Sequence, residues 1–296
     1  MSVFEDLSHA ATSALEAVAP SVVRIGRNGG RGCGVVVGDG LVATNAHNLR
    51  GDETLVTFAD GRQDVATVAG IDIDGDLAVV RVDTGGVPAV TWSSEPASTG
   101  DVVFAVSRAL GGGERVSFGM VSGTERAFRG PRGRRIKGSL EHTAPLPRGS
   151  SGGPVVSLGG TVIGLNTNRL GDGFYLAIPA DQELQDRVAA LTAGQARTRR
   201  RLGVGLAPAH VSRALRRSVG LDERDGLLVR VVEDDSAAAA AGIRQGDLLV
   251  SINGQPLSNA DDLFDALDGA PGEVRVGIVR GTEELEVTVQ FPSGQS

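Results

Sequence analysis

Gly149-Ser150-Ser151-Gly152-Gly153-Pro154 (GSSGGP, residues 149–154) places a serine inside a glycine-rich turn, directly before the apolar pair Val155-Val156. Gly, Ser and Pro are also the usual residues of ordinary loops, so this turn alone decides nothing. A serine in such a turn can present its hydroxyl beside its own amide and a neighbouring one, which is the geometry that acyl transfer requires. Ser151 is therefore a candidate nucleophile.

A serine hydroxyl needs a base near neutral pH, most often a histidine that a third group orients. The chain contains four histidines, at His9, His47, His142 and His210. His47 follows the apolar run that starts at Leu41, where a strand is expected to enter a loop, a typical position for a catalytic residue. His142 lies just before the serine turn, and its spacing does not exclude it.

The carboxylate that orients this base should be buried, so it should border an apolar strand. Asp76 precedes the apolar run Leu77–Val80 and fits this requirement, whereas Asp72 and Asp74 lie in a Gly/Asp-rich turn that is expected to face water. The chain order His47, Asp76, Ser151 matches one known arrangement of the catalytic triad.

These three segments resemble the catalytic blocks of the HtrA/Deg-type serine proteases. The resembling segments are Thr44-Asn45-Ala46-His47, Asp76-Leu77-Ala78-Val79, residues 149–154, Ala19-Pro20-Ser21-Val22-Val23-Arg24-Ile25, Val162-Ile163-Gly164-Leu165-Asn166-Thr167 and Ala177-Ile178-Pro179. The resemblance implies a mostly β fold: a chymotrypsin-like double β-barrel with its active site between the barrels. It also implies that the Gly149 and Ser151 amides form the oxyanion hole.

The C-terminal third resembles the PDZ domain that such proteases carry. Gly242–Gly254 reads GIRQGDLLVSING and ends in an Asn-Gly turn, and a helix through Leu263 and Leu267 and a closing hairpin follow. A PDZ domain is a small α+β domain that binds the C-terminus of a peptide as an added strand. The resemblance assigns the carboxylate nest to the amides of Leu202, Gly203 and Val204. It places Leu263 and Leu267 in the pocket for the last side chain, although plain packing of helix on sheet also explains them.

The pattern along the chain predicts two domains. Helical spacing over residues 3–18 indicates an amphipathic helix, and strand-like segments alternate with Gly/Asp turns from there to about residue 178. A second helix opens at Pro179-Ala180-Asp181. We expect a protease domain over residues 1–195, a basic linker over 196–201 and a PDZ domain over 202–296.

The resemblance implies a serine endopeptidase that degrades unfolded or misfolded polypeptides, regulated by hydrophobic C-termini at the PDZ groove. Residues 144–148 (APLPR) and the segment from Asn166 toward Leu176 place no obvious acidic residue at the base of the substrate pocket, which favours aliphatic side chains before the scissile bond. Two other functions fit the same residues. One is a resting-inactive or chaperone-like peptide-binding protein whose oxyanion hole is unformed, and the other is an esterase.

Two segments depart from the family pattern or add to it. Ser150 stands where the family carries Asn, and Pro145 and Pro147 are additional prolines in the approach to the nucleophile, which leaves the resting activity open. Residues 126–137 are rich in arginine and lie where the family has a regulatory sensor loop. A solvated loop is the simpler explanation of these residues, and a regulatory contact with the PDZ domain or a neighbouring subunit is the alternative.

Composition limits the other functions. The net charge of −7 gives no reason to expect nucleic acid as a partner, and a single cysteine, Cys33, excludes an intrachain disulfide. No metal-ligand cluster and no phosphate-binding loop is visible, so no cofactor is expected. No apolar run is long enough to span a membrane, and the acidic start lacks the features of a signal peptide, so we expect a cytoplasmic protein. The resemblance favours a homotrimer built through the N-terminal region, where Phe4 and Leu7 lie.

Overall fold

The computed structural model describes residues 2–27, 31–108, 113–129, 135–195, 200–207, 209–218, 220–222, 224–267, 270 and 272–291. It divides into two compact units, Met1–Arg197 and Thr198–Ser296, each of which is described by itself. The division falls within residues 196–201, the predicted linker, of which residues 196–199 lie outside the described residues. The predicted domain limits stay a prediction.

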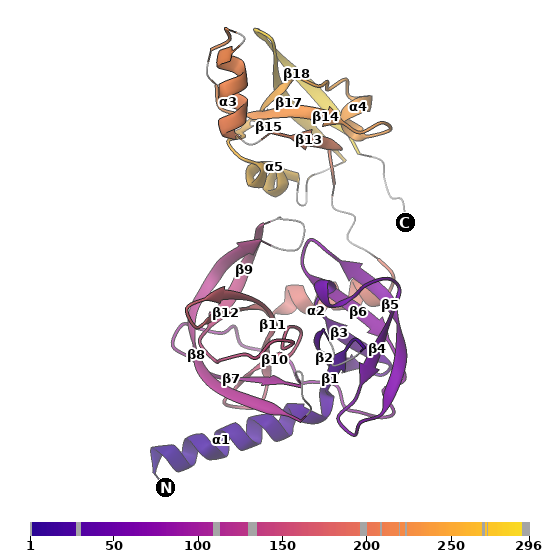
Figure 1. Cartoon of the computed structure of the whole chain (residues 1–296), viewed down its shortest axis with the longest axis vertical. Helices are drawn as coiled ribbons and strands as arrows, with labels where there is room; N and C mark the ends of the chain where they lie inside the picture. Colours follow the sequence, from indigo (N-terminus) through magenta and orange to yellow (C-terminus); the bar gives the residue numbers. More distant parts are fainter. Residues whose placement is uncertain are drawn as a thin grey trace. The chain divides into compact units, whose positions relative to one another are not determined.

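Two closed β-barrels build the first unit (Figure 1). The first barrel has the strand order β1-β2-β3-β6-β5-β4 and the second the order β10-β11-β12-β9-β8-β7. The strands of the first are β1 (Val22–Ile25), β2 (Gly32–Gly38), β3 (Leu41–Thr44), β4 (Glu53–Thr57), β5 (Gln63–Asp72) and β6 (Leu77–Arg81). Those of the second are β7 (Val102–Ser107), β8 (Arg115–Arg129), β9 (Arg135–His142), β10 (Pro154–Ser157), β11 (Val162–Gly171) and β12 (Phe174–Pro179). The predicted mostly β, double-barrel fold is confirmed.

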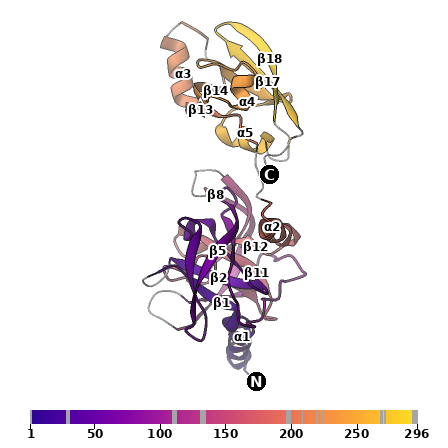
Figure 2. The same cartoon turned by 90° about the vertical axis from the view of Figure 1, so that its right-hand side faces the viewer.

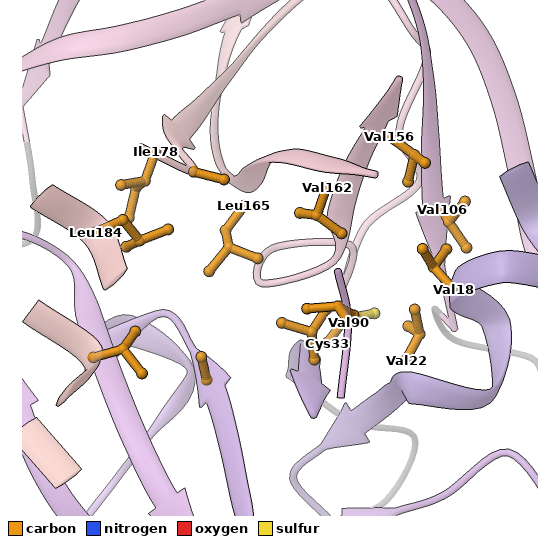
Figure 3. Packing of buried hydrophobic residues seen from close by; sticks show 14 of the residues in the cluster. Val18, Val22, Cys33, Val90, Val106, Val156, Val162, Leu165, Ile178 and Leu184 are labelled. Atoms are coloured by element: carbon orange, nitrogen blue, oxygen red, sulfur yellow. The ribbon is translucent and has the colours of Figure 1, made fainter. Parts of the chain in front are cut away.

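Several strands are apolar on both faces because each lies between two cores. Successive side chains of a strand point to opposite faces. In β2, Val36 belongs to the interior cluster of the first barrel, and its neighbour Val35 belongs to a cluster shared between the barrels. In β10, Val155 and Val156 divide in the same way between the interior of the second barrel and the shared cluster. Figure 3 shows residues of both barrels meeting in this shared core, which fixes the cleft between them.

Two helices flank the barrels at the predicted positions. Helix α1 (Val3–Val18) begins with a capping box in which Glu5 N donates to Ser2 Oγ at 3.3 Å and Ser2 N donates to Glu5 Oε2 at 2.7 Å. Its Ala14 and Val18 are buried in the shared core. None of the helices in the described part of the chain is both long and apolar enough to cross a membrane.

Helix α2 (Gln182–Thr192) follows the second barrel but packs on the first, against β5 and β6 (Figure 2). Asp181 caps it, since its Oδ1 accepts the Leu184 amide at 2.9 Å. The buried residues of α2 are Leu184, Val188 and Leu191, which form one apolar face. A residue of α2 can therefore reach the loops of the first barrel.

The second unit is a sheet with the strand order β13-β14-β15-β17-β18, in which β16 also pairs with β15. Its strands are β13 (Val204–Leu206), β14 (Leu227–Val232), β15 (Leu248–Ile252), β16 (Gln255–Pro256), β17 (Glu273–Arg280) and β18 (Glu283–Gln290), and its helices are α3 (Ala209–Ser218), α4 (Ala237–Ala240) and α5 (Ala260–Leu267). The predicted Asn-Gly turn joins β15 to β16, with φ of 47° at Asn253 and 79° at Gly254. Positive φ at both central residues is what a tight hairpin turn requires.

Candidate active site

Asp76 lies in a turn that two other elements hold in place. Its φ of 52° is in the left-handed region, and Asn45 Nδ2 donates to its carbonyl at 3.0 Å. Asp72, expected to face water, is instead buried and pairs with Arg187 of α2 at 3.0 Å. Arg187 also donates to the Gly75 carbonyl at 3.0 Å. The expectation for Asp72 was wrong because the counter-charge comes from a helix distant in sequence.

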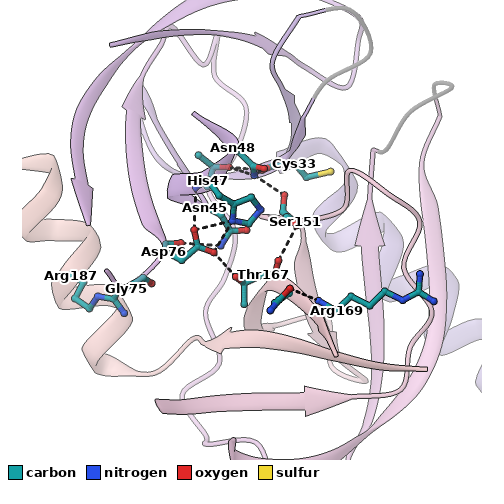
Figure 4. Close-up of polar contacts among 12 residues, drawn as sticks. Cys33, Asn45, His47, Asn48, Gly75, Asp76, Ser151, Thr167, Arg169 and Arg187 are labelled. Atoms are coloured by element: carbon teal, nitrogen blue, oxygen red, sulfur yellow. Dashed lines mark hydrogen bonds and ion pairs between the residues drawn. The ribbon is translucent and has the colours of Figure 1, made fainter. Parts of the chain in front are cut away.

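His47 lies in the 3-10 turn η2 (Ala46–Asn48), which follows β3. Its Nδ1 is 2.9 Å from both Asp76 carboxylate oxygens, and its amide donates to Asp76 Oδ1 at 3.1 Å (Figure 4). Because a carboxylate only accepts hydrogen bonds, Nδ1 carries a proton; in the neutral imidazole Nε2 then keeps its lone pair, which is the tautomer that a general base requires. The His47 side chain is 36% exposed and that of Asp76 only 1%, so of these two side chains the imidazole is the one open to solvent.

Thr167 of β11 touches both ends of the triad from the second barrel. Its Oγ1 donates to Asp76 Oδ2 at 2.5 Å, and its carbonyl accepts the Ser151 hydroxyl at 3.0 Å (Figure 4). Within the described residues, Ser151 Oγ makes no hydrogen bond to His47. The Ser151 hydroxyl is therefore aligned with the Thr167 carbonyl and not with His47.

The serine turn is held through its carbonyl groups. The Gly149 carbonyl accepts Cys33 Sγ at 3.3 Å, and the Ser150 carbonyl accepts the Gly153 amide at 2.9 Å. The Ser151 carbonyl accepts the Cys33 amide at 2.7 Å and Asn48 Nδ2 at 3.0 Å. The Gly149 and Ser151 amides, in contrast, donate to none of the described residues. These two amides are available to an oxyanion.

Side chains and glycines fix the rest of the turn. Ser150 Oγ donates to the Pro147 carbonyl at 2.9 Å, so the serine found in place of the family's Asn closes the turn over the additional proline. Gly152 has φ of 86°, and a Cβ there would lie 2.1 Å from the Cys33 carbonyl oxygen. Only glycine allows the turn to pack this closely on β2.

Two hollows meet at Ser151. The first has a volume of about 410 Å³ and is lined by the three triad residues with Phe128, Arg129, Thr167, Asn168 and Arg169. The second has a volume of about 140 Å³ and lies against the serine turn. Its lining residues are Leu146, Pro147, Arg148, Gly149, Ser150, Ser151, Asn166, Thr167, Asn168, Arg169 and Tyr175. This hollow adjoins both the candidate nucleophile Ser151 and the candidate oxyanion residue Gly149.

His142 is a buried neutral imidazole and not the base. It is fully buried, its Nε2 is 2.8 Å from Asn166 Oδ1, and its ring stacks on Tyr175 with a centroid separation of 5.8 Å. Burial lowers the pKa of His142 to about 4, although the hydrogen bond with Asn166 opposes this shift. The alternative that spacing left open is therefore wrong. His9 lies on α1, and the side chain of His210 lies outside the described residues.

The predicted PDZ residues gather around β13, at one edge of the sheet of the second unit. Gly203 has φ of 77°, and neither its amide nor that of Leu202 donates to any of the described residues. Leu263 and Leu267 of α5 are buried in the same apolar cluster as Leu202, with Val204 packed against it. Leu202, Gly203 and Val204 as the carboxylate nest, and Leu263 and Leu267 as pocket residues, stay predictions.

The arginine-rich segment 126–137 is described in part, since residues 130–134 lie outside the described residues. Arg126 pairs with Glu141 at 3.4 Å, and Phe128 and Arg129 line the larger hollow. This segment therefore reaches the catalytic cleft. Its predicted regulatory role stays a prediction.

The fold and the triad define a chymotrypsin-like serine peptidase with a second unit of PDZ type. Family models match as a trypsin-like peptidase domain over residues 32–165 and as a PDZ domain over residues 228–280. The chain is 32% identical over 283 residues to the putative serine protease HhoA of Synechocystis sp., covering 89% of this chain and 71% of that relative. The chain belongs to the HtrA/Deg family of serine proteases.

Further relatives are similar along most of the chain. The probable periplasmic serine endoprotease DegP-like of Halomonas elongata is 34% identical over 268 residues, which cover 87% of this chain and 55% of the relative. The structure of the HtrA-type protease AlgW with decapeptide matches with a TM-score of 0.75 and 25% identity, covering 96% of this chain and 99% of that one. The chain spans 55% of the Halomonas relative and 63% of the mitochondrial serine protease HTRA2 of Drosophila willistoni.

Three supporting residues were not predicted from the sequence. Thr167 joins Asp76 to Ser151, Asn48 holds the Ser151 carbonyl, and Arg187 holds the turn before Asp76. A signal existed for Thr167, because Asn166-Thr167 places two polar residues at the end of a buried strand. No local signal marks Arg187, since its partners are distant in sequence.

Proposed function

We propose that this protein is a serine endopeptidase that cleaves unfolded polypeptides. The observation that carries the proposal is the state of the site: His47 bridges Asp76 and the cleft with Nε2 free, and the Gly149 and Ser151 amides are unused within the described residues. The names of the relatives, which are serine proteases, support the same chemistry.

The mechanism follows from the roles of these groups. When a peptide occupies the cleft, Ser151 Oγ leaves the Thr167 carbonyl and attacks the scissile carbonyl while His47 Nε2 takes its proton. Asp76 keeps the imidazole in its tautomer and stabilises the imidazolium without itself becoming protonated. The Gly149 and Ser151 amides receive the oxyanion, and His47 then returns the proton to the leaving amine. Water hydrolyses the acyl-enzyme by the same path.

Apolar walls support the predicted preference for aliphatic side chains before the scissile bond. Leu146, Pro147 and the largely buried Tyr175 line the smaller hollow. Each buried methylene contributes about 0.8 kcal/mol, so Val and Leu gain more than Ala in such a pocket.

The second unit is proposed to bind hydrophobic C-termini and to regulate cleavage. Strand β13 lies at the edge of its sheet, so a peptide can add to it as a further strand. The unused amides of Leu202 and Gly203 suit a terminal carboxylate. The structures of the similar protease AlgW with a decapeptide and with a tripeptide support peptide binding as such.

A homotrimer is proposed through α1. Val3 and Phe4 are 81% and 79% exposed on this helix, which is unusual for large apolar side chains. Light scattering of the wild type and of Phe4→Glu measures the assembly. A monomeric wild type contradicts the trimer.

The decisive experiment follows degradation of unfolded casein by the wild type, Ser151→Ala and Ser98→Ala, the last being a matched change at an exposed serine. Cleavage by the wild type and Ser98→Ala but not by Ser151→Ala is expected. Equal cleavage by Ser151→Ala contradicts the proposal.

A resting-inactive peptide-binding protein is the second candidate, because Ser151 Oγ is bonded to Thr167 and not to His47. Labelling of Ser151 by a fluorophosphonate, with and without a hydrophobic C-terminal peptide, separates the two. Absence of labelling in both conditions favours the binding protein, and labelling only with peptide favours a regulated protease.

A further inference from the structure

The pocket beside Ser151 carries two positive charges and no negative one. Among the residues that line the smaller hollow, Arg148 and Arg169 are charged and none is a carboxylate. In the larger hollow the lining carboxylate is Asp76, which already faces His47 and Thr167. The described walls of the substrate cleft are therefore cationic, although the whole chain has a net charge of −7.

Arg169 makes no ion pair with any of the described residues. It lies in β11, two residues after Thr167, and its guanidinium carbon lies 5.6 Å from the centroid of the Tyr175 ring. Figure 4 shows its side chain extended away from the Asp76–His47 pair. Stacking on an aromatic ring orients a guanidinium while leaving its N–H groups unused.

Two further donors face the same pocket. Arg148, the residue before the oxyanion glycine, is exposed and makes no ion pair with the described residues. The hydroxyl of Tyr175 makes no hydrogen bond in the part of the chain that the structure describes, although this residue lines the pocket. The two arginines and the Tyr175 hydroxyl can therefore donate hydrogen bonds to a ligand in this pocket, and no carboxylate lines the pocket to accept them.

We propose that Arg148 and Arg169 extend the specificity of this pocket from aliphatic side chains to glutamate. The inference rests on the proposed endopeptidase function and names an additional substrate class for the same site. The two methylenes of a glutamate lie against Leu146 and Pro147, as an aliphatic side chain does, and its carboxylate reaches the guanidinium groups at the rim. Aspartate lacks one methylene and reaches less far. Lysine and arginine are repelled by the same two charges.

The magnitude of the preference is set by solvent exposure. Both arginines are exposed, and exposed charge pairs are weak and screened by salt. Because a guanidinium and a carboxylate form charge-assisted hydrogen bonds, we expect glutamate to exceed its neutral isostere glutamine by about tenfold in kcat/KM at low salt. The ratio should shrink toward one at high salt.

The experiment uses the full chain and a set of internally quenched peptides that differ only in the residue before the scissile bond: Val, Glu, Gln and Lys. The kcat/KM values of the wild type, Arg148→Gln, Arg169→Gln and the double variant are compared at about 0.05 M and 1 M NaCl. Arg230→Gln in β14 is the control, because it removes one exposed positive charge outside the first unit.

Glutamate is expected to exceed glutamine in the wild type and in Arg230→Gln, and the two should be equal in the double variant, with each kcat/KM divided by the value that the same variant shows for the Val peptide. Equal cleavage after Glu and Gln by a wild type that cleaves after Val overturns this inference but leaves the proposed function standing. Failure to cleave any peptide, with no Ser151-dependent degradation of casein, overturns the proposed function itself.

Discussion

Two aspartates of this protein share the same burial and differ in their partners. Asp76 and Asp247 are each 1% exposed. Asp247 accepts Arg280 Nε and Nη2 at 2.8 Å each and the Arg244 amide at 2.8 Å. Asp76 instead faces the His47 ring and the Thr167 hydroxyl. The Asp247 carboxylate pairs with a permanent cation, whereas the Asp76 carboxylate contacts a ring that can gain and lose a proton.

This difference separates a structural group from a catalytic one. Burial alone would raise the pKa of the Asp247 carboxyl, but the hydrogen bonds from Arg280, with the Arg244 amide, outweigh burial and hold its pKa below the usual value. Since Arg280 never loses its proton, the Asp247–Arg280 pair cannot take part in proton transfer. In the proposed mechanism, Asp76 stabilises a positive charge that exists only while His47 holds the serine proton, which is stabilisation of the transition state.

The largest expected effect is on catalysis at Asp76. Asp76→Asn should lower kcat for a peptide substrate by about 10⁴-fold, because an amide stabilises the wrong His47 tautomer. The unfolding midpoint should change little in comparison. Asp247→Asn is the matched change and should leave cleavage of a small peptide unaltered. Measuring kcat for both variants tests this difference. Similar losses of kcat in Asp76→Asn and Asp247→Asn would contradict a catalytic role that is specific to Asp76.

The second effect is on the stability of the second unit. Arg280→Met leaves the buried Asp247 carboxylate without its cation and should lower the free energy of unfolding by about 3 kcal/mol. Because the pKa of Asp247 is lowered in the folded state, its stabilisation is present above the unfolded pKa of about 3.9 and is lost as the pH falls through the folded value. Urea unfolding of the wild type and Arg280→Met at neutral and acidic pH measures the loss of stability and its pH dependence. If Arg280→Met lowers the free energy of unfolding at neutral pH by less than about 0.5 kcal/mol, the Asp247–Arg280 pair contributes no more than a surface ion pair.

A third effect concerns the buried imidazole of His142. Burial lowers the pKa of His142 to about 4, below the ordinary 6.5. Between these two pH values His142 is protonated in the unfolded chain but not in the folded chain. The free energy of unfolding is therefore highest above about pH 6.5 and falls as the pH drops toward 4. The loss amounts to about 3 kcal/mol over this window. Unfolding of the wild type and His142→Gln across this range should give a flatter profile for the variant.

His142 also shows what sequence reasoning could not decide. A histidine near the serine turn fits a base by its position alone, and only the three-dimensional structure shows that it is sealed against Tyr175 and Asn166. His47, Asp76 and Ser151 stood out in the sequence because each borders an apolar strand and because catalytic chemistry limits the residue types, and the structure places all three at one hollow. The helices 3–18 and from Asp181 were predictable from apolar periodicity and capping.

The parts that escaped prediction depend on contacts between distant segments. Asp72 was expected in water because it lies in a Gly/Asp-rich turn, yet it is buried and pairs with Arg187 of α2. Thr167 and Asp76 are far apart in sequence and come from different barrels, so no local pattern reveals their hydrogen bond. The arginines of the pocket are charged residues on exposed segments, and their sequence does not show that Arg169 stacks on Tyr175.

A fourth, smaller effect tests whether Thr167 orients the triad. Thr167→Val removes the hydroxyl that donates to Asp76 and keeps the side-chain shape, so kcat should fall about 10- to 100-fold while KM changes little. Thr167→Ser restores the donor and should restore most of kcat. Equal activity of the Val and Ser variants would assign Thr167 to packing alone.

The smallest effect lies in the thiol behind the serine turn. Burial raises the pKa of Cys33 to about 11, although the hydrogen bond from the Arg108 amide partly opposes the shift, so the sulfur stays a protonated donor to the Gly149 carbonyl. A thiol donates weakly, so Cys33→Ala should lower kcat by about threefold to tenfold through a looser oxyanion turn, and Cys33→Ser should recover part of it. Binding of a peptide boronate, which mimics the tetrahedral intermediate, should weaken in parallel with kcat, whereas KM should not. If Cys33→Ala weakens boronate binding and raises KM by the same factor, the thiol does not act through the oxyanion amides. Its role is then structural, like that of the Asp247–Arg280 pair, because a purely structural contact stabilises the ground state and the transition state equally.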